Sequence, residues 1–203
     1  CGIAGTIVLT GTDLSAGRVV GLTACISASL LQSVTYATKI FPDLPVLPIP
    51  LVILIVIVVG GIVGWVNGFF VAKFHLHPFI VTLAGMFFGR GMTSIISTDM
   101  ISIKNATFMA WAKYKIYMPF GSYSKRGKFL PAYIYPTVII AIIVLIVIMI
   151  VMKYTKFGRS VYAIGGNEQS ALMMGLNVKR TKMAAYLLDG FLAGLGGFLF
   201  CMN

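Results

Sequence analysis

The chain has 203 residues, of which 59% are hydrophobic and only 10% are charged, and its mean hydropathy is +0.96. Soluble domains carry about a quarter charged residues, so this chain has too few polar side chains to cover a water-soluble globule of its size. Its net charge of +11 comes from basic residues between apolar runs, which favours a membrane protein over a nucleic-acid-binding protein.

Six apolar segments follow one another along the chain. They cover residues 3–9, 19–35, 51–72, 79–98, 133–152 and 184–203. A bilayer core of about 30 Å needs about 20 apolar helical residues, a length that residues 51–72 and 133–152 reach without a charge. We therefore expect an all-α polytopic membrane protein, a bundle in which residues 1–203 are part of a single transmembrane domain cut at both ends.

Two long connections separate the later segments, residues 99–132 and 153–183. Alternating the spans across the bilayer places eight basic residues on one side and seven on the other, so the charges leave the orientation open. The first connection mixes aromatic rings, typical of the headgroup interface, with basic residues that are free to meet an acidic partner. These basic residues are Lys113, Lys115, Lys125, Arg126 and Lys128.

The stretch "GTDLSAGR" (residues 11–18) places two charges, Asp13 and Arg18, inside apolar sequence. A charge in the middle of a bilayer costs about 2.5–3.5 kcal/mol on insertion scales. Gly11 and Gly17 weaken helicity on either side. The stretch predicts either an interrupted membrane helix that lines a polar cavity, with Asp13 and Ser15 exposed to it, or an interfacial loop that caps the next helix.

Two further polar residues lie within predicted spans, Asn67 and Arg90. Asn67 can bond a neighbouring helix, and Arg90 can extend to the headgroups or pair with Asp13 or Asp99. Polar residues inside a membrane usually face the bundle interior. We therefore take Asp13, Ser15, Asn67 and Arg90 as candidates for a translocation path.

Glycines recur at every fourth position in three spans, a spacing that lets helices approach closely in lipid. They are Gly60, Gly64 and Gly68, then Gly85 and Gly89, then Gly190 and Gly194.

The connection 153–183 contains a pattern for a short helix. Gly165 and Gly166 are expected to break the chain, Asn167 to cap a helix and Glu168 to favour its N-terminal end. Gly175 then ends the helix. Leu172 and the two methionines after it would face outward, either docked in a groove of another protein or lying in the headgroups.

The sequence offers little for catalysis. It holds two histidines and five acidic residues, with no pairing suited to acid–base work. His75 and His77 lack a nearby carboxylate or cysteine, which disfavours a metal site. The stretch "GSYSKRGKF" has the wrong spacing for a phosphate-binding loop. We expect no enzyme activity and no bound cofactor or metal.

The segments "GTDLSAGR", "VNGFFVAKFHLHPFIVTLAGMFFGRG", "KFGRSVYAIGGNEQSALMMGLNV" and "LLDGFLAGLGG" occur here in this order. With them the chain resembles permease subunits of bacterial ABC sugar importers of the ribose/galactose class. Its "GTDLSAGR" form, with Thr12, is most similar to the galactose/methyl-galactoside members. The family continues through further spans after the point where this chain stops.

The resemblance implies a multi-pass protein of the bacterial inner membrane. It implies as partners a second permease copy in a homodimer, membrane lipid, a cytoplasmic ATPase with two nucleotide domains that uses the ATP, and a periplasmic sugar-binding protein. It makes residues 153–183 a cytoplasmic coupling loop, with Gly165, Gly166, Asn167, Glu168, Leu172 and Gly175 in the coupling region. It also makes residues 99–132 periplasmic and places the Asp13 segment near the translocation path.

Two other classes compete with an ABC permease. An ion-coupled secondary transporter needs buried carboxylates, and Asp13 and Asp189 are the candidates. A membrane-embedded enzyme needs a catalytic cluster, which the sequence does not offer.

Overall fold

The computed structural model describes residues 2–9, 11–32, 47–97, 101, 103, 106–112, 114, 116–123 and 129–202. The basic cluster predicted to meet an acidic partner, at positions 113, 115, 125, 126 and 128, lies outside the described residues. Its role stays a prediction.

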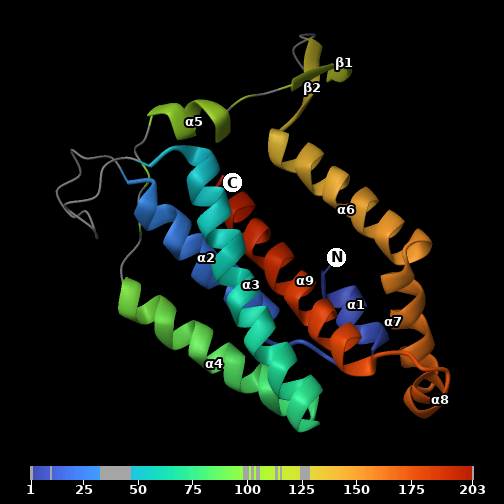
Figure 1. Cartoon of the computed structure of the whole chain (residues 1–203). Helices are drawn as coiled ribbons and strands as arrows, with labels where there is room; N and C mark the ends of the chain where they lie inside the picture. Colours follow the sequence, from blue (N-terminus) through green and yellow to red (C-terminus); the bar gives the residue numbers. More distant parts are fainter. Residues whose placement is uncertain are drawn as a thin grey trace.

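Helices dominate the described chain (Figure 1). In chain order the elements are α1 (Gly2–Val8), α2 (Ala16–Leu30), α3 (Ile49–Phe74), α4 (Pro78–Ile96), α5 (Ala106–Ala112), β1 (Ile116–Tyr123), β2 (Phe129–Ile134), α6 (Pro136–Tyr154), α7 (Lys156–Gly166), α8 (Glu168–Met173) and α9 (Val178–Cys201).

Four of these helices are long and apolar enough to cross a membrane: α3, α4, α6 and α9. Helix α2 is apolar too, but its 15 residues reach only about 22 Å. Prolines begin α4 and α6 at a position where the missing N–H costs nothing. The prediction of an all-α polytopic membrane protein is confirmed.

The centre of the bundle is the packing of α9 against α3 and α2 (Figure 1). Glycines make the α3–α9 contact possible, because a Cβ at Gly60 or Gly64 would collide with the backbone of α9. A Cβ at Gly190 or Gly194 would collide with the backbone of α3 in turn. The regular spacing of glycines therefore gives two helices a backbone-to-backbone contact, as predicted.

Helix α4 packs against α2 on one side of this centre, and α6 and α7 lie on the other side (Figure 1). Only 6% of the apolar window of α6 is buried, so most of its surface is left to lipid or to other protein. Helix α7 reaches the centre through α1 and α9.

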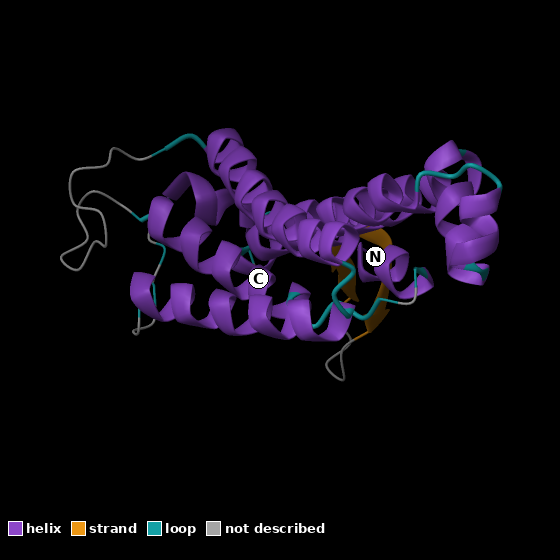
Figure 2. Ribbon diagram, turned by 60° about the horizontal axis from the view of Figure 1, so that its bottom comes forward, coloured by secondary structure: helices purple, strands orange, loops and turns teal. Residues whose placement is uncertain are grey.

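The connections hold more structure than the sequence predicted. Residues 99–132 include the short helix α5, and β1 pairs with β2 in an antiparallel hairpin, from Ile116 opposite Ile134 to Tyr123 opposite Phe129. Aromatic and β-branched residues favour strands, which explains the hairpin. Among the described residues it is the only sheet (Figure 2).

The connection 153–183 is mostly helical, because α7 and α8 occupy much of it and α9 begins at Val178. The hairpin and α8 lie at opposite ends of the molecule (Figure 1).

Candidate functional site

The helix near the N-terminus is interrupted where the sequence predicted. Helix α1 ends at Val8, α2 starts at Ala16, and residues 11–15 between them are not helical. Gly11 fits closely against α9, because a Cβ there would lie 2.6 Å from the hydroxyl oxygen of Tyr186. Gly11, Asp13 and Ser15 of the interruption are buried against protein, as expected for irregular backbone at membrane depth, whereas Thr12 is exposed.

Asp13 anchors the interrupted segment through Ser15. Its Oδ1 atom accepts hydrogen bonds from the backbone N of Ser15 at 2.7 Å and from the Oγ of Ser15 at 2.6 Å. This turn, in which an aspartate bonds its own backbone two residues on, replaces helical bonds that the segment does not make. The same serine precedes the first residue of α2, so the turn fixes where α2 begins.

Asn67 links this turn to α3. Its Nδ2 donates a hydrogen bond to Ser15 Oγ at 2.9 Å, although the two residues are 52 positions apart. The side chains of Asp13, Ser15 and Asn67 are all buried. Three of the four residues predicted for the translocation path thus form one hydrogen-bonded polar cluster.

Helix α4 closes the polar cluster. The Oγ1 of Thr82 donates to the backbone oxygen of Thr12 at 3.1 Å. Gly85 leaves room for the cluster, because a Cβ there would lie 2.9 Å from Asn67 Oδ1 and 3.3 Å from Ser15 Cβ. Residues from α3, α4 and the interrupted segment therefore meet at one point.

The fourth predicted residue, Arg90, does not join the cluster. Its side chain is exposed on α4, and so is that of Arg18 on α2. Within the described ranges the only salt bridge joins Glu168 and Lys182, so Arg90 is not paired with Asp13. Asp99, its other predicted partner, lies outside the described residues.

From the sequence, Asp189 was predicted only as an ion site of a secondary transporter. The structure places it beside the polar cluster of Asp13, Ser15 and Asn67. It is buried in α9 and lines a cavity of about 10 Å³ together with Asp13 and Ser15. The signal that points to it is the one that identified Asp13, namely an acidic residue inside an apolar segment.

The second candidate region is α8 and its flanks. Asn167 caps α8, with its Oδ1 accepting from the backbone N of Ser170 at 3.0 Å. Gly175 follows the helix at φ 77°, a left-handed conformation that favours glycine. The predicted cap, helix and stop are confirmed.

The two glycines before α8 act differently from the prediction. Gly165 and Gly166 are the last residues of α7, and the helical path breaks only at Asn167. A Cβ at Gly165 would collide with the backbone oxygen of Val8. Gly165 therefore lets α7 pack closely on α1. The break between α7 and α8 lies at Asn167 and does not depend on Gly165.

Helix α8 has one buried face and one exposed face. Ala171 is fully buried against a cluster that includes Leu9, Val161 and Ile164. Leu172, Met173 and Met174 are 55%, 89% and 66% exposed. Three large apolar side chains in a row at the surface mark a contact with lipid or with another protein.

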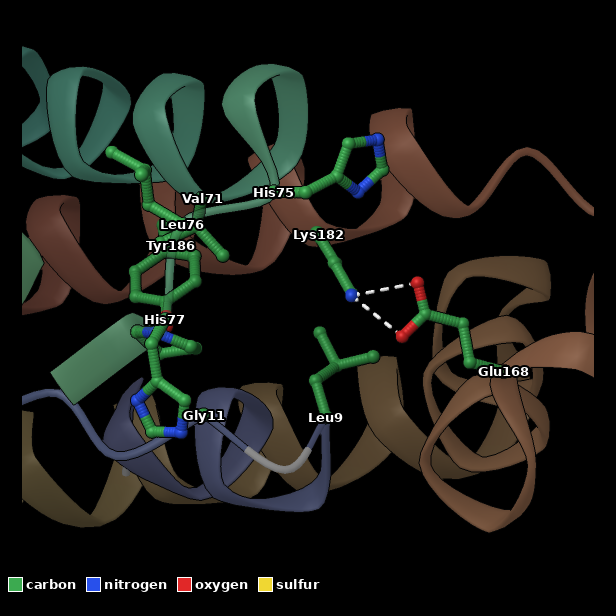
Figure 3. A pocket seen from close by; sticks show the side chains of 10 residues that line it. Leu9, Gly11, Val71, His75, Leu76, His77, Glu168, Lys182 and Tyr186 are labelled. Atoms are coloured by element: carbon green, nitrogen blue, oxygen red, sulfur yellow. Dashed lines mark hydrogen bonds and ion pairs between the residues drawn. The ribbon is translucent and has the colours of Figure 1, made fainter.

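An ion pair ties α8 to the start of α9. The Nζ of Lys182 lies 2.7 Å and 2.8 Å from the two carboxylate oxygens of Glu168. The pair borders a pocket of about 290 Å³, which also reaches the α3–α4 turn at His75 and His77. Figure 3 shows Glu168 and Lys182 at one side of this pocket and Tyr186, His77 and Gly11 at the other.

Membrane-length helices, an interrupted helix with a buried polar cluster and a short exposed helix at one end together define a polytopic membrane protein. The family described as "Branched-chain amino acid transport system / permease component" matches residues 1–203, and the chain belongs to this family.

Several curated relatives are permeases for sugars. The chain is 38% identical to the galactose/methyl galactoside import permease protein MglC of Salmonella typhimurium, over 98% of this chain and 57% of that protein. It is 33% identical to the ribose import permease protein RbsC of Haemophilus influenzae, over 98% of this chain and 54% of that protein. With the fructose import permease protein FruG of Bifidobacterium longum it shares 32% identity, over 97% of this chain and 53% of that protein.

The chain thus spans a little over half the length of these relatives. No solved structure matches it.

Proposed function

We propose that this chain is part of the sugar-permeating subunit of an ATP-driven importer in the bacterial inner membrane. The relatives import galactose or methyl galactoside, fructose and ribose. The 38% identity with a galactose/methyl galactoside permease favours that sugar or a related monosaccharide as substrate. The chain itself performs no catalysis and binds no cofactor, and ATP is hydrolysed by a partner subunit.

The observation that carries this proposal is the exposed apolar end of α8. Helix α8 has six residues and about 9 Å of length, too short to span a bilayer. Its exposed Leu172 and Met173, together with Met174 directly after it, suit a hydrophobic groove on another protein. We take that partner to be a cytoplasmic ATPase with two nucleotide domains, and on this proposal residues 153–183 face the cytoplasm and residues 99–132 the periplasm.

The ion pair between Glu168 and Lys182 suits the transmission of force. A push on α8 reaches α9 through this pair and through the buried Ala171. Helix α9 in turn contacts α3 along its glycines. The proposed cycle is alternating access, in which the bundle closes on one side of the sugar and opens on the other.

Asp13, Ser15, Asn67 and Arg90 remain our candidates for the translocation path. The first three are hydrogen-bonded to one another, and Thr82 of α4 is bonded to the same interrupted segment. A sugar therefore contacts them only when α4 moves away from that segment. A second permease copy and a periplasmic sugar-binding protein complete the assembly. The second copy supplies the wall of the translocation path that this chain leaves open, and the binding protein delivers the sugar.

Two substitutions in α8 test this proposal. Leu172→Asp places a charge where an apolar contact is expected. Glu168→Lys places a second ammonium group next to that of Lys182. Each should abolish co-purification of the ATPase with the full-length permease, or abolish the stimulation of ATP hydrolysis by loaded binding protein. Gln169→Asp adds the same charge at an exposed neighbour and is the matched control.

The charge swap Glu168→Lys with Lys182→Glu should recover part of the coupling that Glu168→Lys loses, because it rebuilds the ion pair. Normal association and normal stimulation in both single variants would show that α8 is only a headgroup-bound connector, and the proposal would fall.

A further inference from the structure

Two buried carboxyl groups lie at the centre of the bundle, away from the proposed coupling contact. Asp13 comes from the interrupted segment and is 8% exposed, and Asp189 comes from α9 and is 3% exposed. Both line the same cavity of about 10 Å³. Two carboxylates so placed, away from water, cannot both be ionised without a compensating positive charge.

The hydrogen bonds around Asp13 identify it as the charged member of the pair. Its Oδ1 atom accepts from Ser15 N and from Ser15 Oγ. Ser15 has no further proton to give, and its Oγ accepts from Asn67 Nδ2. Ser15 therefore donates two hydrogen bonds to Asp13, as an ionised carboxylate requires, and Asn67 holds the Ser15 hydroxyl in that orientation.

Asp189 has the opposite surroundings. Its Oδ2 atom is buried and has no hydrogen-bond partner among the described residues. A negative charge on an oxygen without a donor is costly at this depth, whereas a protonated carboxyl group there can donate to its neighbour.

We propose that Asp13 and Asp189 form a buried proton-binding site, in which Asp189 holds the proton and Asp13 carries the negative charge. The proton on Asp189 leaves one net charge instead of two in the bundle. This proposal concerns the chain itself and does not depend on which sugar the protein transports.

A bound cation is the main competing occupant, and the geometry disfavours it. The cavity has room for about one water molecule, whereas a hard cation needs several oxygen ligands. Asp13 Oδ1 already accepts two hydrogen bonds, which leaves it poorly placed as a ligand.

Among the described residues no basic side chain closes this site. The basic side chains on the packed elements are Arg18 on α2, Lys73 on α3, Arg90 on α4, and Lys179, Arg180 and Lys182 at the start of α9. The other titratable groups there are Cys25 on α2 and Tyr186 and Cys201 on α9. Arg18, Lys73, Arg90, Lys179 and Arg180 are exposed, Lys182 is paired with Glu168, and α1 contains no titratable group. Within the described residues no positive side chain is therefore buried beside the two carboxyl groups.

Infrared spectroscopy of the purified full-length permease at neutral pH tests the proposal. Wild-type protein with ¹³C-labelled aspartate should show a protonated-carboxyl stretch that carries the isotope shift and moves again in D₂O. Asp189→Asn should lose this band, and Asp13→Asn, the matched variant of its neighbour, should keep it.

Three results would overturn the proposal. The first is a wild-type protein without a protonated aspartate band, a result that does not depend on whether either variant folds. The second is a band that Asp13→Asn removes and Asp189→Asn keeps, since the proton would then sit on Asp13. The third is a missing band together with a melting temperature that rises on addition of sodium or potassium chloride but not of choline chloride, which would indicate a cation site.

Discussion

Ser15 connects three parts of the molecule through a single hydroxyl group. It donates to Asp13 in its own segment and accepts from Asn67 on α3, and its backbone starts α2. Because the residue is buried, water cannot replace either bond when the hydroxyl is removed.

Ser15→Ala should therefore lower the stability of the permease by about 1–3 kcal/mol, the range for a buried polar group left without its partner. The measurement is the thermal or denaturant midpoint of the purified protein in detergent. Ser94→Ala is the matched control, because Ser94 Oγ bonds only the Arg90 backbone oxygen at an exposed site of α4. Equal midpoints for the two variants would contradict the role of Ser15.

At the scale of residues, the sequence predicted which polar side chains are buried in the bundle better than it predicted the groups they bond. Asp13 and Asn67 stood out because polar groups in apolar segments need partners. That they share Ser15 depends on how α3 crosses the interrupted segment, which no local pattern encodes. Arg90 was grouped with them for the same reason and lies apart, while Asp189 lies beside them.

At the scale of elements, close contact between α3 and α9 defines the bundle. Gly64 faces the backbone of Tyr186 and Gly190, with no room for a Cβ. Gly64→Ala should therefore force α3 and α9 apart and lower both the yield and the melting temperature of the folded permease. Gly91→Ala is the control, because a Cβ at Gly91 meets nothing within 4 Å. A Gly64→Ala protein as stable as the control would show that this contact tolerates separation.

The glycine spacing predicted that such contacts exist, and the apolar lengths predicted the spans. The short helix α8 was also predicted, since its cap, its acidic first residue and its glycine stop are local signals. The role of Gly165 was not, because its need for close approach comes from α1, more than 150 residues earlier in the chain. Hairpin β1–β2 was missed because most of its residues were assigned to a connection, and Tyr133 and Ile134 were assigned to the following span.

At the scale of the whole molecule, the hairpin and α8 lie at opposite ends of the bundle (Figure 1). The interrupted segment, α3, α4 and α9 meet between these ends. A push on α8 has a continuous packed route to this meeting point through α9. That arrangement is what an importer needs if force enters at one face and sugar at the other.

The central claim is that ATP hydrolysis by a partner drives sugar through this permease. The most direct measurement is uptake of labelled galactose into proteoliposomes that contain the full-length permease and its ATPase, with loaded binding protein outside and ATP inside. The account predicts uptake that stops when either the ATPase or ATP is left out and does not respond to an imposed proton or sodium gradient. Uptake driven by such a gradient without ATP would contradict it and favour an ion-coupled transporter.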